Sequence, residues 1–220
     1  MVFINKIIKE LSNHKKDLFK TFFPKSRYNF NFKNISKFKK FNTIVIIGMG
    51  GSILGAKSIY YFLRHKIDKK IIFIDNLDEA YLKRIKKENN LKKVLFLIIS
   101  KSGNTTETII NSGFFSTFIN KNNTIIISEE KNNILYNFAK NKKIYFIRHN
   151  PNIGGRYSVF SDVGMLPIYL MNLNPEKFKK NLPKLIKKQK LLKNFKNIKK
   201  INNRTKVLVL FNYIPELSEF

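Results

Sequence analysis

A glycine-rich segment, IGMGGSILGAKS at residues 47–58, follows a short apolar run and has the residue types of an anion-binding loop. Glycines let backbone N–H groups approach an oxyanion closely, and the amino terminus of a following helix adds a favourable field of about half a charge. Gly51 and Ser52 stand at the predicted turn between strand and helix. We therefore expect this turn to bind a phosphate-like group.

A Walker phosphate loop nearly matches the same segment. That motif needs Gly-Lys-Ser after the GxxxxG that runs from Gly50 to Gly55. Ala56 intervenes and displaces Lys57 by one position on the helix. We therefore expect Lys57 to point away from a phosphate bound at the loop.

A dinucleotide-binding fingerprint is the second near match. It needs a third glycine where Ile53 stands, although Gly48 and Gly50 fit and Asp75 could bind a ribose hydroxyl. We favour an interpretation of Asp75 as a turn residue beside Asn76. An enzyme that uses NAD is kept as an alternative.

A second segment, SKSGNTTET at residues 100–108, gathers hydroxyl groups around a glycine at another turn from strand to helix. Hydroxyls suit a phosphate dianion because they donate hydrogen bonds without adding fixed charge, while a helix that begins near Thr105 aims free N–H groups at the same point. Asn104 and Glu107, three residues apart, fit a capping box, and we favour this structural role over direct chemistry for Glu107. The hydroxyl-bearing candidates are Ser100, Ser102 and Thr105.

A third segment, NPNIGGRYSVFSDVGMLP at residues 150–167, contains Gly154, Gly155 and Arg156. A guanidinium here could stabilise negative charge on a bound substrate. The alternative is a structural arginine on the surface after a glycine turn. A turn that brings Arg156 towards a phosphate site favours the role in chemistry.

Five short β-branched runs, with helical segments between them, predict the elements that position these loops. Continuous apolar runs indicate strands covered on both faces, so we expect an α/β fold with a doubly wound, five-stranded parallel sheet. In the flavodoxin-like order 2-1-3-4-5, the first and third strands are neighbours, and both phosphate loops open into the crevice at their carboxyl ends. The natural ligand is then a small phosphate ester. The predicted strands are residues 43–47, 71–75, 94–99, 124–128 and 144–147.

The segments that connect the first strands show a helical spacing of apolar residues. Such spacing predicts amphipathic helices whose apolar face packs on the sheet. The residues expected in this core are Leu54, Ile59, Phe62 and Leu63 in the first connection and Tyr81, Leu82 and Ile85 in the second.

Both ends of the chain are expected to lie outside this sheet. Residues 1–40 predict an N-terminal helical arm, either packed or partly loose, and residues 173–200 a basic helical linker that Pro183 ends or kinks. The run at 206–211 is typical of a buried strand, which we interpret as the start of an incomplete second α/β unit at 201–220. The phosphate-binding domain itself is expected to span residues 41–172.

The composition narrows the classes of function. Lys and Arg outnumber Asp and Glu by 43 to 14, which gives a net charge of +29. Such a charge is typical of proteins that bind nucleic acids or anionic membranes. Because the lysines are spread from end to end among Ile, Asn and Phe, we favour a solvated basic surface and expect neither partner. The sequence has no cysteine, its histidines (His14, His65, His149) have no metal-ligand spacing, and its apolar runs fall short of the roughly 18 residues of a membrane span. We expect a cytoplasmic protein.

Together the three segments resemble, in order, signature segments of the glucose-6-phosphate isomerase (phosphoglucose isomerase) family. The third segment is the most specific. The second is shared by sugar isomerase domains in general, which include aminosugar synthases and phosphosugar-sensing regulators. The resemblance covers roughly residues 41–172, and the basic helix and final strand resemble the family's passage into its second domain.

The resemblance implies a reaction and roles for individual residues. The reaction is the interconversion of glucose 6-phosphate and fructose 6-phosphate through a cis-enediol, in glycolysis and gluconeogenesis, with neither cofactor nor metal. Arg156 is implied to stabilise the enediolate, and the family forms homodimers whose subunits both complete each active site. The implied substrate-binding residues are Gly51, Ser52, Ser100, Lys101 through its backbone, Ser102 and Thr105.

The family's general base is a glutamate of the second domain, which has no counterpart in these 220 residues, and neither does its ring-opening histidine or a further lysine. The final residues NYIPELSEF resemble the stretch that leads up to that glutamate. We therefore expect a truncated chain with little or no isomerase activity by itself. A non-catalytic phosphosugar-binding module or regulator is the alternative, although residues 1–40 give no convincing helix-turn-helix signal.

Overall fold

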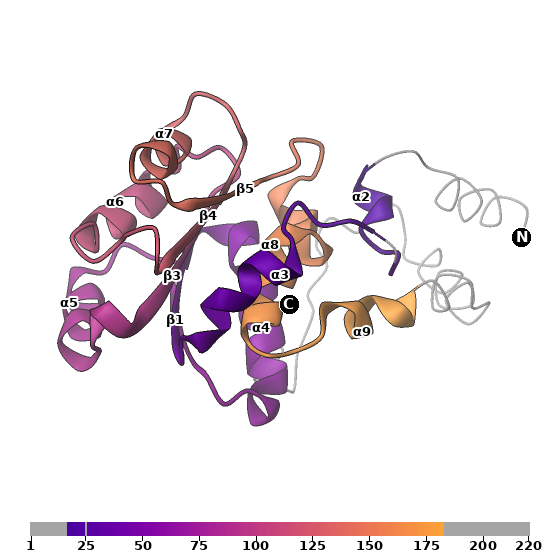
Figure 1. Ribbon diagram of the computed structural model, residues 1–220, viewed down its shortest axis with the longest axis horizontal. Coiled ribbons are helices and arrows are strands. Elements are labelled where there is room, and N and C mark those ends of the chain that lie inside the picture. The colour runs from indigo at the N-terminus through magenta and orange to yellow at the C-terminus, as the bar shows by residue number, and fades with distance from the viewer. Residues whose placement is uncertain (1–16, 25, 183–220) are drawn as a thin grey trace, which may run out of the picture.

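The computed structural model describes residues 17–24 and 26–182, which are built around a five-stranded parallel sheet (Figure 1). The strands are β1 (Thr43–Gly48), β2 (Lys70–Ile74), β3 (Val94–Ile99), β4 (Thr124–Ser128) and β5 (Tyr145–Arg148). Their order is β2-β1-β3-β4-β5, and each neighbouring pair is parallel. The predicted α/β class, parallel sheet and flavodoxin-like order are therefore confirmed.

Helices cover both faces of the sheet (Figure 1). One face is covered by α5 (Glu79–Glu88), α6 (Thr106–Phe114) and α7 (Ile134–Asn141), and the other by α3 (Phe32–Ser36), α4 (Leu54–Leu63) and α8 (Asp162–Leu170). The shorter described elements are α2 (Asp17–Lys20), α9 (Pro175–Lys180) and the 3-10 turns η1 (Lys37–Lys40), η2 (Gly50–Ser52), η3 (Arg64–Lys66), η4 (Leu91–Lys93) and η5 (Gly155–Phe160). Within the described ranges, no helix has both the length and the apolar content to cross a membrane.

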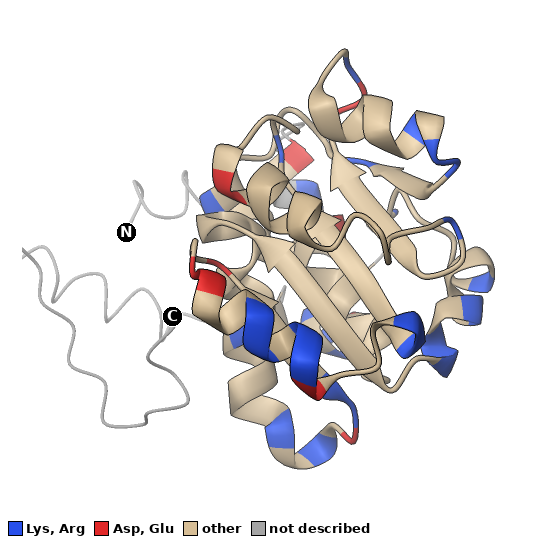
Figure 2. Cartoon of the chain, turned by 90° about the vertical axis from the view of Figure 1, so that its left-hand side faces the viewer, with Lys and Arg blue, Asp and Glu red and all other residues tan. Residues whose placement is uncertain are grey.

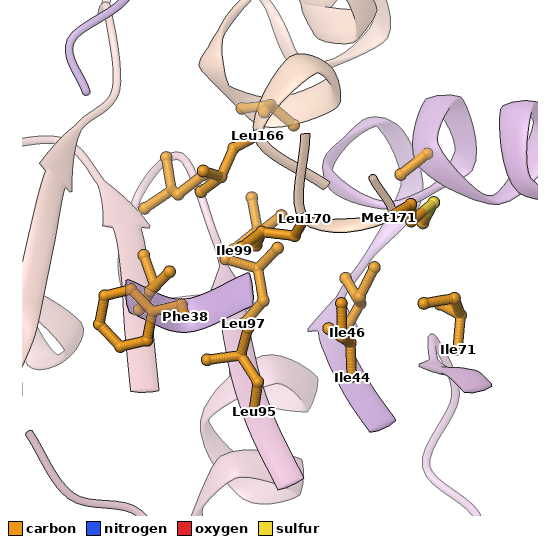
Figure 3. Packing of buried hydrophobic residues seen from close by; sticks show 14 of the residues in the cluster. Phe38, Ile44, Ile46, Ile71, Leu95, Leu97, Ile99, Leu166, Leu170 and Met171 are labelled. Carbon is orange, nitrogen blue, oxygen red and sulfur yellow. The ribbon is translucent and has the colours of Figure 1, made fainter. Parts of the chain in front are cut away.

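The central strands are buried on both faces. Ile44 and Ile46 of β1 belong to one core cluster and Val45 and Ile47 to the other, because successive side chains of a strand point to opposite faces. In the first cluster the strands meet Leu166 of α8, as Figure 3 shows. This double burial explains the continuous apolar runs in the sequence.

Two residues of α4 that were expected in the core are exposed instead. Leu54 is 38% and Phe62 51% exposed, whereas Ala56 and Ile59 are buried. The helix turns the face around Ala56 and Ile59 towards its neighbours. The prediction that Leu54 and Phe62 lie in the core, which was made from the spacing of apolar residues alone, is therefore wrong. The other residues predicted in this core are buried or packed against it: Leu63, Tyr81, Leu82 and Ile85.

The described part of the N-terminal arm packs against the sheet unit. Ile35 and Phe38 are buried in the first core cluster, and the backbone N–H of Asn29 donates to the Asp162 carboxylate at 2.6 Å. At the other end, α9 begins at Pro175 with Asn174 as its N-cap. The rest of the predicted arm, the remainder of the basic linker and the strand predicted at 206–211 lie outside the described residues.

Candidate functional site

The three hydroxyls that follow β3 form one cluster at the start of α6. Ser100 Oγ lies 2.8 Å and Ser102 Oγ 3.4 Å from Thr105 Oγ1. The turn that closes the cluster needs the positive φ of 70° at Gly103, a conformation that glycine adopts at little cost. The N–H of Gly103 also donates to Ser100 Oγ at 3.2 Å. The structure therefore brings all three predicted hydroxyls together.

The predicted capping box on α6 is not formed. Thr105 is the N-cap and accepts no capping hydrogen bond through its side chain, while Asn104 Oδ1 accepts the N–H of Ile134 at 3.0 Å. The turn at Gly103 directs Asn104 towards the start of α7, where an unpaired helix N–H needs an acceptor. The first turn of α6 thus keeps the arrangement of N–H groups that favours an anion.

The loop after β1 reaches the same edge of the sheet. Gly48 at the end of β1 pairs with Ile99 at the end of β3. A Cβ added to Gly48 would lie 2.9 Å from the Ile99 carbonyl oxygen and 3.3 Å from Ser52 Cβ. Ser52 therefore lies beside the end of β3, where Ser100 follows Ile99 in the chain.

The loop after β5 packs directly on the loop after β1. A Cβ added to Gly51 would lie 2.2 Å from the carbonyl carbon and oxygen of Gly155 and 2.7 Å from the amide nitrogen of Arg156. Only a glycine at position 51 allows the two backbones to approach so closely. This contact holds the backbone of Arg156 against Gly51. Arg156 itself is solvent-exposed.

The side chain of Lys101 joins two of these loops, a role that the sequence analysis missed because only its backbone was singled out. Lys101 Nζ donates to the carbonyl oxygen of Pro151 at 2.7 Å and lies 3.8 Å from Glu129 Oε1. A hydrogen bond from Lys131 is the largest influence that lowers the pKa of Glu129, and the charge of Lys101 adds to it. Pro151 lies 50 residues after Lys101 in the chain, so no local sequence pattern predicts this contact.

Lys57 and Asp75, which the two rival phosphate motifs single out, bind each other. Lys57 Nζ lies 2.9 Å from Asp75 Oδ2. Lys57 therefore points to the end of β2. A dinucleotide would need the Asp75 carboxylate to bind its ribose, but this carboxylate is paired with Lys57. The ion pair therefore disfavours the dinucleotide-binding alternative.

One titratable side chain near these loops is buried. His149 follows β5, its Nδ1 lies 2.8 Å from the carbonyl oxygen of Asn150, and burial lowers its pKa. Among residues 17–24 and 26–182, no three His, Asp or Glu side chains are grouped to hold a metal ion.

Comparison with known proteins decides the family. The phosphoglucose isomerase family model matches residues 7–205. The chain belongs to the phosphoglucose isomerase family. It is 33% identical over 171 residues to the glucose-6-phosphate isomerase of Methanocaldococcus jannaschii, a match over 74% of this chain and 42% of the relative. A glucose-6-phosphate isomerase of Borrelia garinii is 35% identical over 158 residues, or 65% of this chain and 29% of the relative. The chain thus spans less than half the length of these two relatives.

Two solved structures share the fold of this chain. A glucose-6-phosphate isomerase from Chlamydia trachomatis superposes with a TM-score of 0.60 at 26% identity, over 76% of this chain and 35% of that one. A protein from Thermus thermophilus superposes with a TM-score of 0.69 at 18% identity, over 81% of this chain and 46% of that one, and shows the fold alone. The resemblance inferred from the three sequence segments is confirmed.

Proposed function

We propose that this chain binds a hexose 6-phosphate at the carboxyl edge of β1 and β3 and serves the interconversion of glucose 6-phosphate and fructose 6-phosphate. The observation that carries the proposal is the convergence of three loops: the hydroxyl cluster beside the start of α6, Ser52 beside the end of β3, and Arg156 against Gly51. A sugar phosphate has a dianion at one end and hydroxyls along its chain, which is the pattern that these groups complement.

The phosphate end is assigned to the loop after β3. The hydroxyls of Ser100, Ser102 and Thr105 and the backbone N–H of Lys101 would donate to the phosphate oxygens, with the amino terminus of α6 adding its field. Gly51 and Ser52 would line the sugar, since their turn adjoins the hydroxyl cluster.

Arg156 is assigned to the reacting end of the sugar. Moving a proton between C2 and C1 places negative charge on the sugar oxygens of an enediolate, and a guanidinium directed at that charge stabilises it. The step also needs a general base, a role that we assign to none of these residues. These residues would therefore supply binding and charge stabilisation.

Calorimetric titration of the 220-residue chain with fructose 6-phosphate and, separately, with NAD tests this function. Saturable binding of fructose 6-phosphate with no heat from NAD supports the proposal. Binding of NAD without binding of the sugar phosphate would instead favour the dinucleotide alternative and contradict the assignment of all three loops.

A further inference from the structure

The contact between the loops after β1 and β5 has only backbone at its centre. Gly51 faces the carbonyl group of Gly155 and the amide nitrogen of Arg156, with no room for a side chain between them. Two glycines in contact offer little to resist sliding, because they have no side chains to interlock. The relative position of Arg156 and the turn at Ser52 must therefore be fixed by a neighbouring group.

Ser158 is that neighbour. Its side chain is completely buried, and its Oγ lies 3.0 Å from the carbonyl oxygen of Gly51 and 2.7 Å from that of Gly155. A hydroxyl has a single proton, so Oγ shares it between the two carbonyls or alternates between them. Ser158 itself is held by η5, because the N–H and the hydroxyl of Ser161 both donate to its carbonyl oxygen, at 2.9 and 2.6 Å.

We propose that Ser158 is a positioning residue that fixes Arg156 relative to the sugar-binding turn, an inference that rests on the proposed function. Ser158 is buried under both loops and touches no substrate. It connects the carbonyl of Gly51, which precedes Ser52, to the carbonyl of Gly155, which precedes Arg156. Loss of its hydroxyl removes the hydrogen bond that links the two carbonyls and lets the loops separate.

The consequence is selective, because the phosphate-binding cluster after β3 does not depend on Ser158. Removing the hydroxyl should weaken recognition of charge at the reacting end of the sugar and leave phosphate recognition unchanged. Two ligands separate these effects: a five-carbon aldonic acid phosphate, whose carboxylate mimics the enediolate charge, and a six-carbon alditol phosphate, which has a hydroxyl there. The ratio of their dissociation constants measures the contribution of the guanidinium.

The experiment compares Ser158→Ala with Ser112→Ala in the full 220-residue chain. Ser112 is a matched control, because it is also buried and donates to a backbone carbonyl, that of Thr108, but within one helix. Ser158→Ala should reduce the preference for the aldonate about tenfold, as loss of one buried hydrogen bond would, with the affinity for the alditol phosphate unchanged. Arg156→Gln should abolish the preference, Ser158→Thr should restore most of it, and Ser112→Ala should leave it intact.

Hydrogen exchange without ligand tests the same contact apart from any function. Amides around Gly51 and Arg156 should exchange faster in Ser158→Ala than in the wild type or in Ser112→Ala. Equal exchange, or an unchanged ligand ratio in Ser158→Ala when Arg156→Gln loses it, would overturn the positioning role. If the wild type binds neither sugar phosphate while exchange still responds to Ser158→Ala, the proposed function fails and the contact between the loops stands.

Discussion

Thr105 is the residue on which the hydroxyl cluster depends. Its Oγ1 lies within hydrogen-bond distance of both Ser100 and Ser102, and its backbone forms the N-cap of α6. A phosphate bound there would meet a hydroxyl and helix N–H groups in one place. Hydrogen bonds to a charged group contribute more than those between neutral groups, so this hydroxyl should matter for binding.

Replacing Thr105 with valine keeps the shape of the side chain and removes its hydroxyl. We expect Thr105→Val to weaken binding of fructose 6-phosphate by roughly tenfold or more, because one hydrogen bond to the phosphate dianion is lost and the two serines lose their common partner. Thr106→Val, at the exposed neighbouring position, is the matched control and should bind as the wild type does. Equal affinities of the two variants in calorimetry would contradict the assignment of Thr105.

Lys179 is a charged residue buried away from the loops after β1 and β3. Its Nζ donates to Ser26 Oγ at 2.7 Å and lies 4.3 Å from the centre of the Tyr28 ring. Burial lowers its pKa to about 8, and the negative charge of Asp162 opposes this effect. Since an unfolded lysine keeps its proton to a pH of about 10.4, the unfolded chain binds more protons above pH 8, and this residue makes stability rise with pH there.

The free energy of unfolding should therefore increase by about 1 to 2 kcal/mol between about pH 8 and pH 9.5 as a contribution of Lys179. The window ends there because burial raises the pKa of Tyr28, and that group acts in the opposite direction at higher pH. Urea denaturation at several pH values measures the effect. Lys179→Met should lose the rise in stability with pH, and Lys180→Met, at an exposed position, should keep it. The same pH profile in both variants would show that Lys179 is not the source of the rise.

At the scale of elements, the turns η2 and η5 meet where only glycine fits. Gly51→Ala would drive a methyl group into the backbone of Gly155, so it should lower the free energy of unfolding by about 2 to 4 kcal/mol and abolish binding of fructose 6-phosphate. Gly113→Ala is the control, because its Cβ would meet nothing within 4 Å and its position is inside α6. That change should stabilise the chain by about 0.5 to 1 kcal/mol. Thermal denaturation in which Gly51→Ala is as stable as the wild type would contradict the packing of the two loops.

The sheet and its order could be predicted from the sequence, because strands buried on both faces are continuously apolar and the connections are long enough for the crossovers that parallel pairing requires. That order also places the loops after β1 and β3 side by side, so the hydroxyl cluster and Ser52 followed from local patterns. The role of Asn104 could not be predicted, since its partner Ile134 lies in another connection. The exposure of Leu54 and Phe62 depends likewise on which face α4 turns to its neighbours.

At the scale of the whole molecule, the positive charge of residues 17–24 and 26–182 is not concentrated on one element. Figure 2 shows Lys and Arg on several separate helices and loops, with Asp and Glu among them. The hydroxyl cluster after β3 offers neutral donors and a helix terminus, so the phosphate recognition proposed there would not require the excess of lysine.

Turnover tests the roles proposed for these residues. None of the residues assigned to the site is a general base, so proton transfer by them alone should be slower by about 10² to 10⁴-fold than with a positioned base, although sugar phosphate still binds. A coupled assay that converts fructose 6-phosphate to glucose 6-phosphate measures this. A rate near that of a complete isomerase of the same family would show that a base is present among these residues and would contradict the proposed division of roles.

The convergence of three loops on one ligand is the central claim, and backbone amide resonances report on it directly. Titration of the isotopically labelled chain with fructose 6-phosphate should shift the amides of Ser52, Thr105 and Arg156 with one common saturation curve, since a single ligand contacts all three loops. Amides that shift in only one loop, or that saturate at different ligand concentrations, would show that these residues belong to separate surfaces and would contradict the account.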